Sequence, residues 1–365
     1  MTIKNKEPIR ILCVFATLNR GGAESMCMNL YRNIDRTKVQ FDFIKHTDDK
    51  CAFEDEILSL GGKIYNAPHF SLKSLRSYKK WWNDFLTKHN EYRIIHCHYF
   101  TICTAIFPVA KKHKLITIAH CHSAYKAKNL RAFLEIIFMR QAAKYTDYRL
   151  ACTEDAGKMM YGKLPFMVIY NAINVEDYTF NSEIRKKIRN ELSIDDDTLL
   201  LGTVGRIEKV KNPHGIIDIV NLIRSIRPKT SFLWVGDGIQ HDETIKYAKT
   251  TGAFDNIIFV GVKSNVNDYI QAMDVFIMPS LHEGFPVNMV EAQANGIKCF
   301  VSDTISKATD ITGLVKYLPI NNYDLWVNEI MTCDKQRVNT LKKVKEAGFD
   351  IKQTSKELED FYLSL

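Results

Sequence analysis

Short apolar runs that alternate with longer helical stretches constrain the fold of this chain more than any other feature. Runs rich in β-branched residues are typical of strands buried on both faces, and the stretches between them have helical periodicity. The expected strands are residues 9–18, 39–45, 93–97, 115–119, 147–152, 167–170, 199–204, 232–235, 257–260, 274–279 and 298–302. The main expected helices of the first half are residues 72–88, 102–112 and 130–145. This order predicts an α/β fold with parallel sheets covered by helices on both faces.

Length and one polar stretch divide the chain. At 365 residues it exceeds the size of a typical single core, so two domains are expected. The charged segment 176–198 is typical of a linker with a lead-in helix. We therefore place a first domain at residues 1–180, a second at residues 181–350, and a closing helix at residues 351–365.

Two carboxylates follow the strand expected at residues 274–279. Glu283 lies in the loop and Glu291 in the next helix, slightly more than two turns apart and so on similar sides of it. Between them are Gly284, Phe285 and Pro286. The glycine lets backbone approach a ligand, and a proline at a helix start removes no needed N–H group.

The first amides of that helix, at Val287, Asn288 and Met289, are expected to form an anion site. Two carboxylates beside it would repel a bare phosphate, but they suit a ligand that combines sugar hydroxyls with a diphosphate. Taken alone, Glu283 and Glu291 also fit a plainer interpretation, in which one carboxylate caps the helix and the other is exposed.

An arginine and a lysine lie five positions apart on the loop after the strand expected at residues 199–204. Arg206 has a planar fork and Lys211 is a point charge, and both are suited to one diphosphate. A basic loop taken alone is more often merely solvated. The acidic loop downstream favours the phosphate interpretation.

A glycine pair, Gly21 and Gly22, separates the first strand from the first helix. It is not a Gly-x-Gly-x-x-Gly fingerprint, so a dinucleotide is not indicated. The pair allows backbone to lie close to a ligand. A plain tight turn is the alternative.

The tripeptide His-Cys-His ends two expected strands, at residues 96–98 and 120–122. Ligands collect at the carboxyl ends of parallel strands. Histidine and cysteine are zinc ligands, but no carboxylate pattern supports a metal here, and we predict none. The nine cysteines are scattered without a Cys-x-x-Cys pair, which favours small buried side chains over a disulfide framework.

The segment from Glu283 to Ala294, Glu-Gly-Phe-Pro-(four residues)-Glu-Ala-Gln-Ala, resembles the signature of the group 1 retaining glycosyltransferases. That family has the GT-B fold, two Rossmann-like domains facing each other across a cleft. Three further segments resemble the family in the expected order, at residues 21–24, 171–174 and 205–213. After Ser302 the chain departs from the commonest pattern and is similar to the branch that assembles capsular polysaccharide, exopolysaccharide or lipopolysaccharide.

The resemblance implies a role for each candidate in the second domain. Glu283 would hold the transferred sugar and Glu291 the ribose, while Arg206 and Lys211 would hold the diphosphate. Phe285, Pro286, Val287 and Asn288 would line the donor site. The backbone of Val262 or Lys263 would read the nucleobase.

In the first domain, the glycine loop would face the donor and the acceptor. His120 is the first choice, and His122 the second, for the histidine that reaches the donor sugar. The resemblance also implies that the last helix crosses back to pack on this domain.

The expected activity is transfer of a hexosyl unit, with retention, from a nucleoside diphosphate, most simply UDP, to a glycan or lipid-linked glycan. Arg206, Lys211 and the helix amides would stabilise the departing diphosphate, so no metal or other cofactor is required. The alternatives are an epimerase or phosphorylase of the same fold, or a catalytically silent partner subunit that binds nucleotide sugar.

Positive charge is concentrated in the first half. Residues 1–180 contain 27 Lys and Arg against 17 Asp and Glu, within a net charge of +8 for the chain. No segment reaches the roughly 18 apolar residues of a membrane span, and a cytoplasmic protein is expected. Basic segments at residues 79–82, 111–114 and 126–131 are candidate contacts with an anionic inner membrane face, with a solvated surface as the alternative. The aromatic and basic pattern of nucleic-acid binding is missing.

Overall fold

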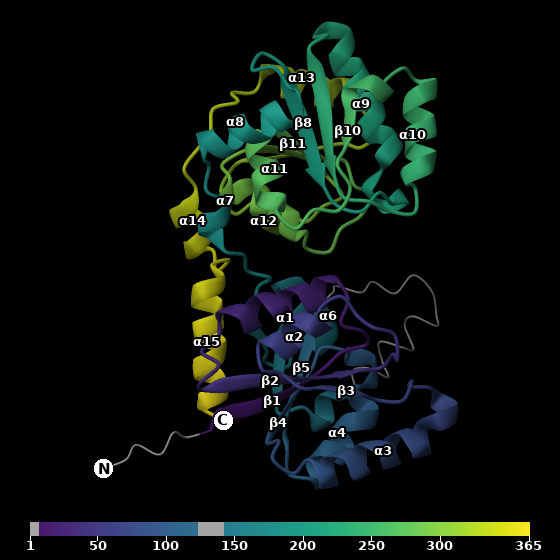
Figure 1. Ribbon diagram of the computed structural model, residues 1–365, viewed down its shortest axis with the longest axis vertical. Coiled ribbons are helices and arrows are strands. Elements are labelled where there is room, and N and C mark those ends of the chain that lie inside the picture. Colours follow the sequence, from purple (N-terminus) through teal and green to yellow (C-terminus); the bar gives the residue numbers. More distant parts are fainter. Residues whose placement is uncertain (1–6, 123–141) are drawn as a thin grey trace. The chain divides into compact units, whose positions relative to one another are not determined.

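The computed structural model describes residues 7–122 and 142–365. The chain divides into two compact units (Figure 1). The first comprises Met1–Ala172 together with Ile351–Leu365, and the second comprises Ile173–Asp350. The division therefore falls a few residues before the position expected from the polar segment.

The first unit contains a seven-stranded sheet in the order β3-β2-β1-β4-β5-β6-β7, with parallel pairing throughout the described strands. Its strands are β1 Ile9–Val14, β2 Val39–Lys45, β3 Ile64–Asn66, β4 Ile94–Cys97, β5 Ile116–Cys121, β6 Tyr148–Ala151 and β7 Met167–Val168. Its described helices are α1 Gly22–Asn33, α2 Glu54–Ser59, α3 Leu75–Lys88, α4 Cys103–Lys112, α6 Glu154–Tyr161 and α15 Ile351–Leu363. The expected helix at residues 130–145 lies largely outside the described residues.

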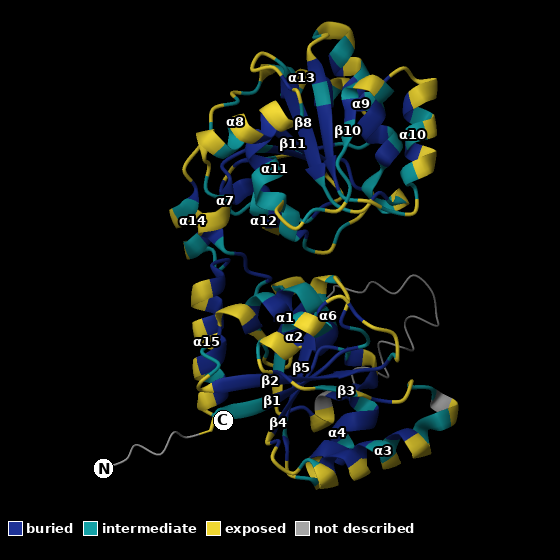
Figure 2. Ribbon diagram, viewed as in Figure 1, coloured by how far each residue is buried: buried dark blue, intermediate teal, exposed yellow. Residues whose placement is uncertain are grey.

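Different helices cover the two faces of this sheet. Successive residues of β1 point to opposite faces, so Ile11 packs with Tyr31 of α1, whereas Leu12 packs with Trp82 of α3 and Phe107 of α4. Figure 2 shows the helices buried on the side that faces the sheet and exposed on the other. Burial on both faces is the reason that these strands are nearly continuous apolar runs.

The closing helix α15 belongs to the first unit. It packs against α1, and its Tyr362 is buried. The Tyr362 hydroxyl lies 2.5 Å from Nδ1 of His96, and Glu359 accepts a hydrogen bond of 3.0 Å from the amide of Asp35. The resemblance had implied that the last helix packs here, and the structure confirms it.

The second unit contains a six-stranded sheet in the order β10-β9-β8-β11-β12-β13, also parallel. Its strands are β8 Leu199–Val204, β9 Thr230–Val235, β10 Ile257–Phe259, β11 Val275–Met278, β12 Lys298–Ser302 and β13 Val315–Leu318. Its helices are α7 Val175–Tyr178, α8 Ser182–Glu191, α9 Pro213–Ile226, α10 His241–Thr250, α11 Val266–Ala272, α12 Val287–Ala294, α13 Tyr323–Thr332 and α14 Leu341–Glu346. Helices again cover both faces, so the predicted α/β class with two parallel sheets is confirmed.

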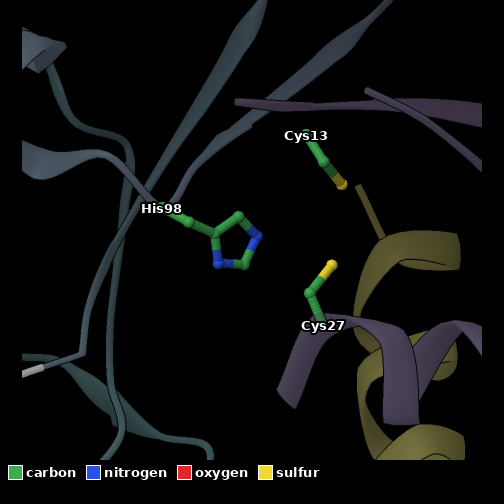
Figure 3. A group of neighbouring side chains, drawn as sticks. All are labelled: Cys13, Cys27 and His98. Atoms are coloured by element: carbon green, nitrogen blue, oxygen red, sulfur yellow. The ribbon is translucent and has the colours of Figure 1, made fainter. Parts of the chain in front are cut away.

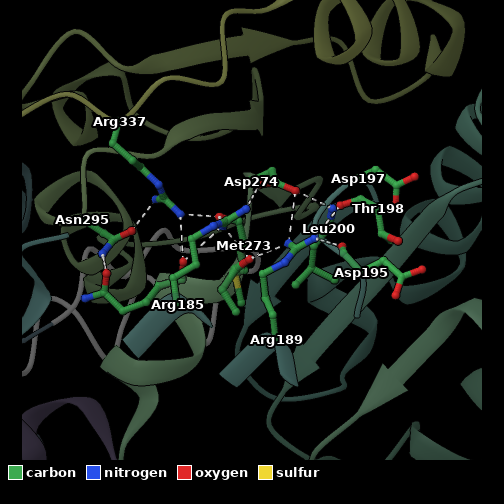
Figure 4. Close-up of polar contacts among 12 residues, drawn as sticks. Arg185, Arg189, Asp195, Asp197, Thr198, Leu200, Met273, Asp274, Asn295 and Arg337 are labelled. Carbon is green, nitrogen blue, oxygen red and sulfur yellow. Dashed lines mark hydrogen bonds and ion pairs between the residues drawn. The ribbon is translucent and has the colours of Figure 1, made fainter. Parts of the chain in front are cut away.

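A charged network attaches α8 to the sheet of the second unit (Figure 4). Asp274, just before β11, accepts a hydrogen bond of 2.5 Å from Arg185 and one of 2.8 Å from the amide of Leu200. Arg189 is buried and lies 3.5 Å from the same carboxylate. Its second terminal nitrogen donates to the carbonyl of Thr198 at 2.8 Å. One carboxylate thus balances two arginines and fixes the start of β8.

The two tryptophans of the candidate membrane contact at residues 79–82 pack within the first unit. Trp82 is fully buried, and Trp81 stacks on Phe85 with ring centroids 5.1 Å apart. Trp82 packs in the core because α3 turns this side toward the sheet, so it is not the interfacial residue that the sequence suggested. Residues 126–131 lie outside the described residues. None of the described helices has the length and apolar character needed to cross a bilayer.

Candidate functional site

The candidate site of the second unit lies where its strand order reverses. β8 has β9 on one side and β11 on the other, and the chain leaves the carboxyl ends of these strands in opposite directions. Such a switch point opens a crevice in which α/β sheets bind ligands. A small pocket lies there, and it is lined by Thr203, Val204, Gly205, Arg206, Lys211, Trp234, Met278 and Ser280.

A glycine brings Lys211 over the backbone at the end of β8. Gly205 has a φ of +150°, and a Cβ at this position would lie 3.3 Å from Cε and 3.5 Å from Nζ of Lys211. The carbonyl of Gly205 accepts a hydrogen bond of 3.0 Å from the Trp234 indole. The loop is thereby held in a conformation that favours glycine and leaves room for the ammonium group.

Lys211 meets Glu283, the first carboxylate of the loop after β11. Nζ of Lys211 lies 2.7 Å from Oε1 of Glu283, and the two side chains are only 19% and 14% exposed. The loops are also joined by the amide of Leu281, which donates to the carbonyl of Val210 at 2.8 Å. Two residues that the sequence assigned to different parts of one ligand are therefore direct neighbours.

Two buried oxygen atoms close to this ion pair accept no hydrogen bond from the described residues. They are Oγ of Ser280 and Oδ1 of Asn288. The contact between Lys211 and Glu283 is an ion pair without the alignment of a hydrogen bond. Buried polar atoms are normally satisfied, so these oxygens are available to accept hydrogen bonds from water or from a hydroxyl-bearing ligand.

Arg206 is on the same loop but is oriented differently. Its side chain is 78% exposed, and its guanidinium lies 2.7 Å from Oε1 of Glu208. The residue lines the pocket together with Lys211. Its charged group faces solvent and is already paired, so convergence with Lys211 on one phosphate stays a prediction.

Helix α12 begins beside this ion pair. Pro286 precedes its first residue, Val287, and no side chain caps the helix. The side chain of Asn288 donates to the carbonyl of Val204 at 2.5 Å, which attaches the helix start to β8. The amide of Met289 donates to the Pro286 carbonyl at 3.1 Å. The expectation of three free amides is thus wrong for Met289, because the first turn closes on the proline carbonyl.

Phe285 lies half-buried in the loop that precedes the helix, and Gly284 has open space around it. The Phe285 ring stacks on Phe349 with centroids 5.3 Å apart. This contact holds the loop against the segment that follows α14, near the end of the second unit. The open space at Gly284 leaves its backbone accessible to a ligand.

Glu291 lies further along α12 and has a partner that the sequence did not indicate. The hydroxyl of Tyr178, the last residue of α7, donates to Oε1 of Glu291 at 2.8 Å. Burial raises the pKa of Glu291, and this hydrogen bond acts in the opposite direction. No pattern in the sequence signalled Tyr178, because 112 residues separate it from the helix position that it contacts.

The loop after β10 contains the two residues assigned to the nucleobase. Val262 is 65% exposed, and Nζ of Lys263 lies over the ring of Tyr269, 5.6 Å from its centroid. The carbonyl of Gly261 accepts a hydrogen bond of 2.9 Å from the amide of Gly236. This loop therefore borders the carboxyl end of the same sheet.

In the first unit the glycine pair lies at the start of α1. Gly21 is the residue before the helix, and Gly22 has open space around it. No side chain caps α1, and Glu24 lies in its first turn. Burial raises the pKa of the Glu24 carboxyl. The backbone is open at Gly22, whereas at Gly21 the Glu24 carboxylate occupies the space beside it, where a Cβ would collide with Oε2 of Glu24.

His120 is buried, with only 1% of its surface exposed. Neither of its ring nitrogens has a hydrogen-bond partner among the described residues. Burial lowers the pKa of His96 and of His122 to about 3, so both imidazoles are neutral at pH 7. The histidines of β4 and β5 stack on one another, with the rings of His120 and His122 4.1 Å apart. The predicted histidines thus form one neutral cluster.

Two family models match this chain. Residues 184–335 match the model described as glycosyl transferases group 1, and residues 20–177 match the model of glycosyltransferase family 4. The two matches correspond to the second and the first unit. Together they span the candidate residues of both sheets.

Individual proteins extend this similarity. EpsF of Bacillus subtilis (strain 168), assigned to the glycosyltransferases, is 30% identical over 89% of this chain and 88% of its own length. CapH of Staphylococcus aureus, a capsular polysaccharide biosynthesis glycosyltransferase, is 23% identical over 98% of this chain and 99% of its own. An Escherichia coli galactosyltransferase named for UDP-Gal and a diphosphoundecaprenol-linked sugar is 25% identical over 61% of this chain and 62% of its own.

Solved structures share the fold. Anabaena Alr3699/HepE in complex with UDP superposes with a TM-score of 0.78 at 17% identity, over 98% of this chain and all of that one. Sucrose-phosphate synthase from Thermosynechococcus elongatus gives 0.74 at 16% identity, over 98% and 99%. At such low identity the similarity establishes the architecture of two parallel-sheet domains.

Proposed function

Because this chain belongs to the group 1 glycosyltransferases of polysaccharide biosynthesis, we propose that it transfers a hexosyl unit, with retention, from a UDP-sugar to a glycan or lipid-linked glycan. The observation that carries the proposal is the Lys211–Glu283 pair, which lies among unsatisfied buried oxygens at the β8/β11 switch point. A cation, hydroxyl acceptors and an uncapped helix start suit a sugar joined to a diphosphate.

Departure of the diphosphate is the difficult step, since negative charge grows on the leaving oxygen. Lys211 stabilises that charge from a partly desolvated position, where its electrostatic effect exceeds that in water. The amides at Val287 and Asn288 add the positive end of α12. We expect Arg206 to break its ion pair with Glu208 and to bind the same diphosphate. We expect these groups to make turnover independent of added divalent metal.

Glu283 accepts hydrogen bonds from hydroxyls of the transferred sugar through its carboxylate, whose Oε1 is paired with Lys211. The acceptor hydroxyl attacks on the face that the diphosphate leaves, and the departing diphosphate takes its proton. A covalent role for Glu283 is disfavoured, because retaining hydrolases pair two carboxylates about 5 Å apart and Glu283 pairs with a lysine instead. The donor-binding roles that the resemblance implies for His120 and the glycine pair of the first unit stay predictions.

A thermal-shift screen of the purified chain tests the donor class. UDP, GDP, ADP, UDP-glucose and UDP-galactose are compared, and UDP and at least one UDP-sugar should raise Tm. A ligand that binds only the folded state stabilises it by about 2.7 kcal/mol at 100 times its Kd. A shift with GDP or ADP alone would contradict the UDP assignment, and no shift with any nucleotide would contradict the site.

Product analysis separates the alternatives. A transferase leaves UDP and an extended acceptor, whereas an epimerase forms an isomeric nucleotide sugar without acceptor, and a phosphorylase requires phosphate. A partner subunit would bind the nucleotide without turnover.

Glu291 is the proposed ribose ligand, and its replacement should act on donor binding. Tyr178 donates to one carboxylate oxygen, and we expect the other to accept from the ribose. Glu291→Gln should raise the donor KM about tenfold with little change in kcat, since a hydrogen bond to a charged group is worth about 1.5–3 kcal/mol. Tyr178→Phe should give a smaller rise, and exposed Glu183→Gln none. An unchanged KM in Glu291→Gln would remove this residue from the ribose site.

The same carboxylate gives donor binding a pH dependence. Burial raises the pKa of Glu291, so it takes up a proton at a pH where an exposed glutamate is still ionised. The charged form is lost as the pH falls, and the donor KM of the unmodified enzyme should rise in that direction. Glu291→Gln should lack this part of the profile.

A further inference from the structure

A second group of chemically reactive side chains lies in the first unit and has no part in the proposed transfer. Cys13 is on β1, Cys27 on α1 and His98 directly after β4, and all three are buried. One ligand atom from each, two sulfurs and an imidazole nitrogen, lies within 4.8 Å of the others. Figure 3 shows the His98 ring turning one nitrogen toward the two sulfur atoms.

The two nitrogens of His98 have different surroundings. Nδ1 lies 2.8 Å from Nε2 of His122, which fixes the ring. Nε2 is buried and has no hydrogen-bond partner among the described residues. A histidine held by one nitrogen and free at the other is the arrangement found at metal-binding imidazoles.

Distances and charge indicate which ion would fit. Zinc binds sulfur at about 2.3 Å and nitrogen at about 2.0 Å. Two atoms bound to one zinc ion therefore lie less than 4.8 Å apart, as the ligand atoms of this group do. Two thiolates and a neutral imidazole around a divalent cation form an uncharged complex. That balance matters because an unpaired charge in an apolar core is costly. A monovalent ion would leave a buried negative charge.

We propose that Cys13, Cys27 and His98 bind one zinc ion, or a divalent ion of similar softness, that joins β1, α1 and β4. His98 also forms a group with His96 and His120, whose ligand atoms lie within 4.8 Å of one another. We expect the fourth ligand to come from this group or from water. The ion ties three elements of the first unit together and takes no part in the departure of the diphosphate.

Metal content tests this proposal independently of activity. The full chain is purified under reducing conditions, supplied with Zn²⁺, desalted, and analysed for zinc by mass spectrometry. About one zinc per chain is expected for the unmodified protein, and a large loss for Cys27→Ser and His98→Asn. Cys152→Ser is the matched control, because Cys152 is a buried free cysteine of the same unit outside both groups.

Cobalt provides a second readout on the unmodified protein. Co²⁺ bound by two thiolates should give intense charge-transfer absorption in the near ultraviolet, and added zinc should abolish it. Zinc well below one equivalent without this absorption, or equal zinc in all variants, would overturn the proposal. A disulfide between Cys13 and Cys27 that persists in the protein purified under reducing conditions would also overturn it. Donor binding by UDP is measured separately, so failure of either proposal is recognisable.

Discussion

Lys211→Ala is expected to lower kcat about 100-fold or more while the chain stays folded. Removal of one group that stabilises developing negative charge typically costs a factor of about 10²–10³ in kcat. Lys211 is the cation held closest to Glu283, and the rigid Gly205 turn keeps it there. The measurement is the initial rate of nucleotide release at saturating donor and acceptor, with the far-ultraviolet spectrum and Tm as checks of folding.

Lys209→Ala is the control for this variant. Lys209 is an exposed lysine of the same loop, and it is not among the residues that line the pocket. Its loss changes the net charge equally but should leave kcat within about twofold. If Lys211→Ala retains near-normal turnover, the leaving-group role assigned to this lysine is incorrect, whatever the donor proves to be.

Asp274→Asn should reduce the free energy of unfolding of the second unit by about 3 kcal/mol. Removing one partner of a buried pair leaves its counterpart uncompensated, at a cost of about 3–5 kcal/mol, and the carboxylate here is slightly exposed. Arg189 would remain buried beside Arg185 without an anion. Urea unfolding followed by the fluorescence of Trp234 and Trp326, both buried in this unit, measures the change.

Asp255→Asn is the matched control for the charge network. Asp255 is exposed and has no ion pair among the described residues. It should change the free energy of unfolding by no more than a few tenths of a kcal/mol. Similar free energies of unfolding for the two variants would contradict the stabilising role of the ion pairs around Asp274.

Local pattern was sufficient for most of the fold. The runs at residues 39–45 and 199–204 became β2 and β8 with the predicted limits, because both strands are buried along nearly their whole length. The sequence missed β3 and β13, one of the two edge strands of each sheet. Ile64–Asn66 and Val315–Leu318 are short and partly exposed, so they lack the continuous apolar signal.

Contacts between residues far apart in the chain could not be predicted from the sequence. Motif spacing indicated Lys211 and Glu283 separately, but their ion pair depends on how β8 and β11 lie side by side. Tyr178 is similar, because its hydrogen bond to Glu291 is set by the packing of α7 on α12. The proposed zinc group is a further example, because Cys13 and Cys27 become neighbours of His98 only in the folded unit.

The position of α15 has a consequence for how the protein is made. The first unit needs Ile351–Leu365 to complete its core, with Leu358 and Tyr362 packed on the sheet face beside α1. A ribosome makes these residues only after the whole of the second unit. The amino-terminal half therefore waits, with one face of its sheet incompletely covered, while the later-made unit is free to fold first. In a nascent chain the first unit should therefore complete its core only after residues 351–365 have been made, against the usual order in which domains fold from the amino terminus.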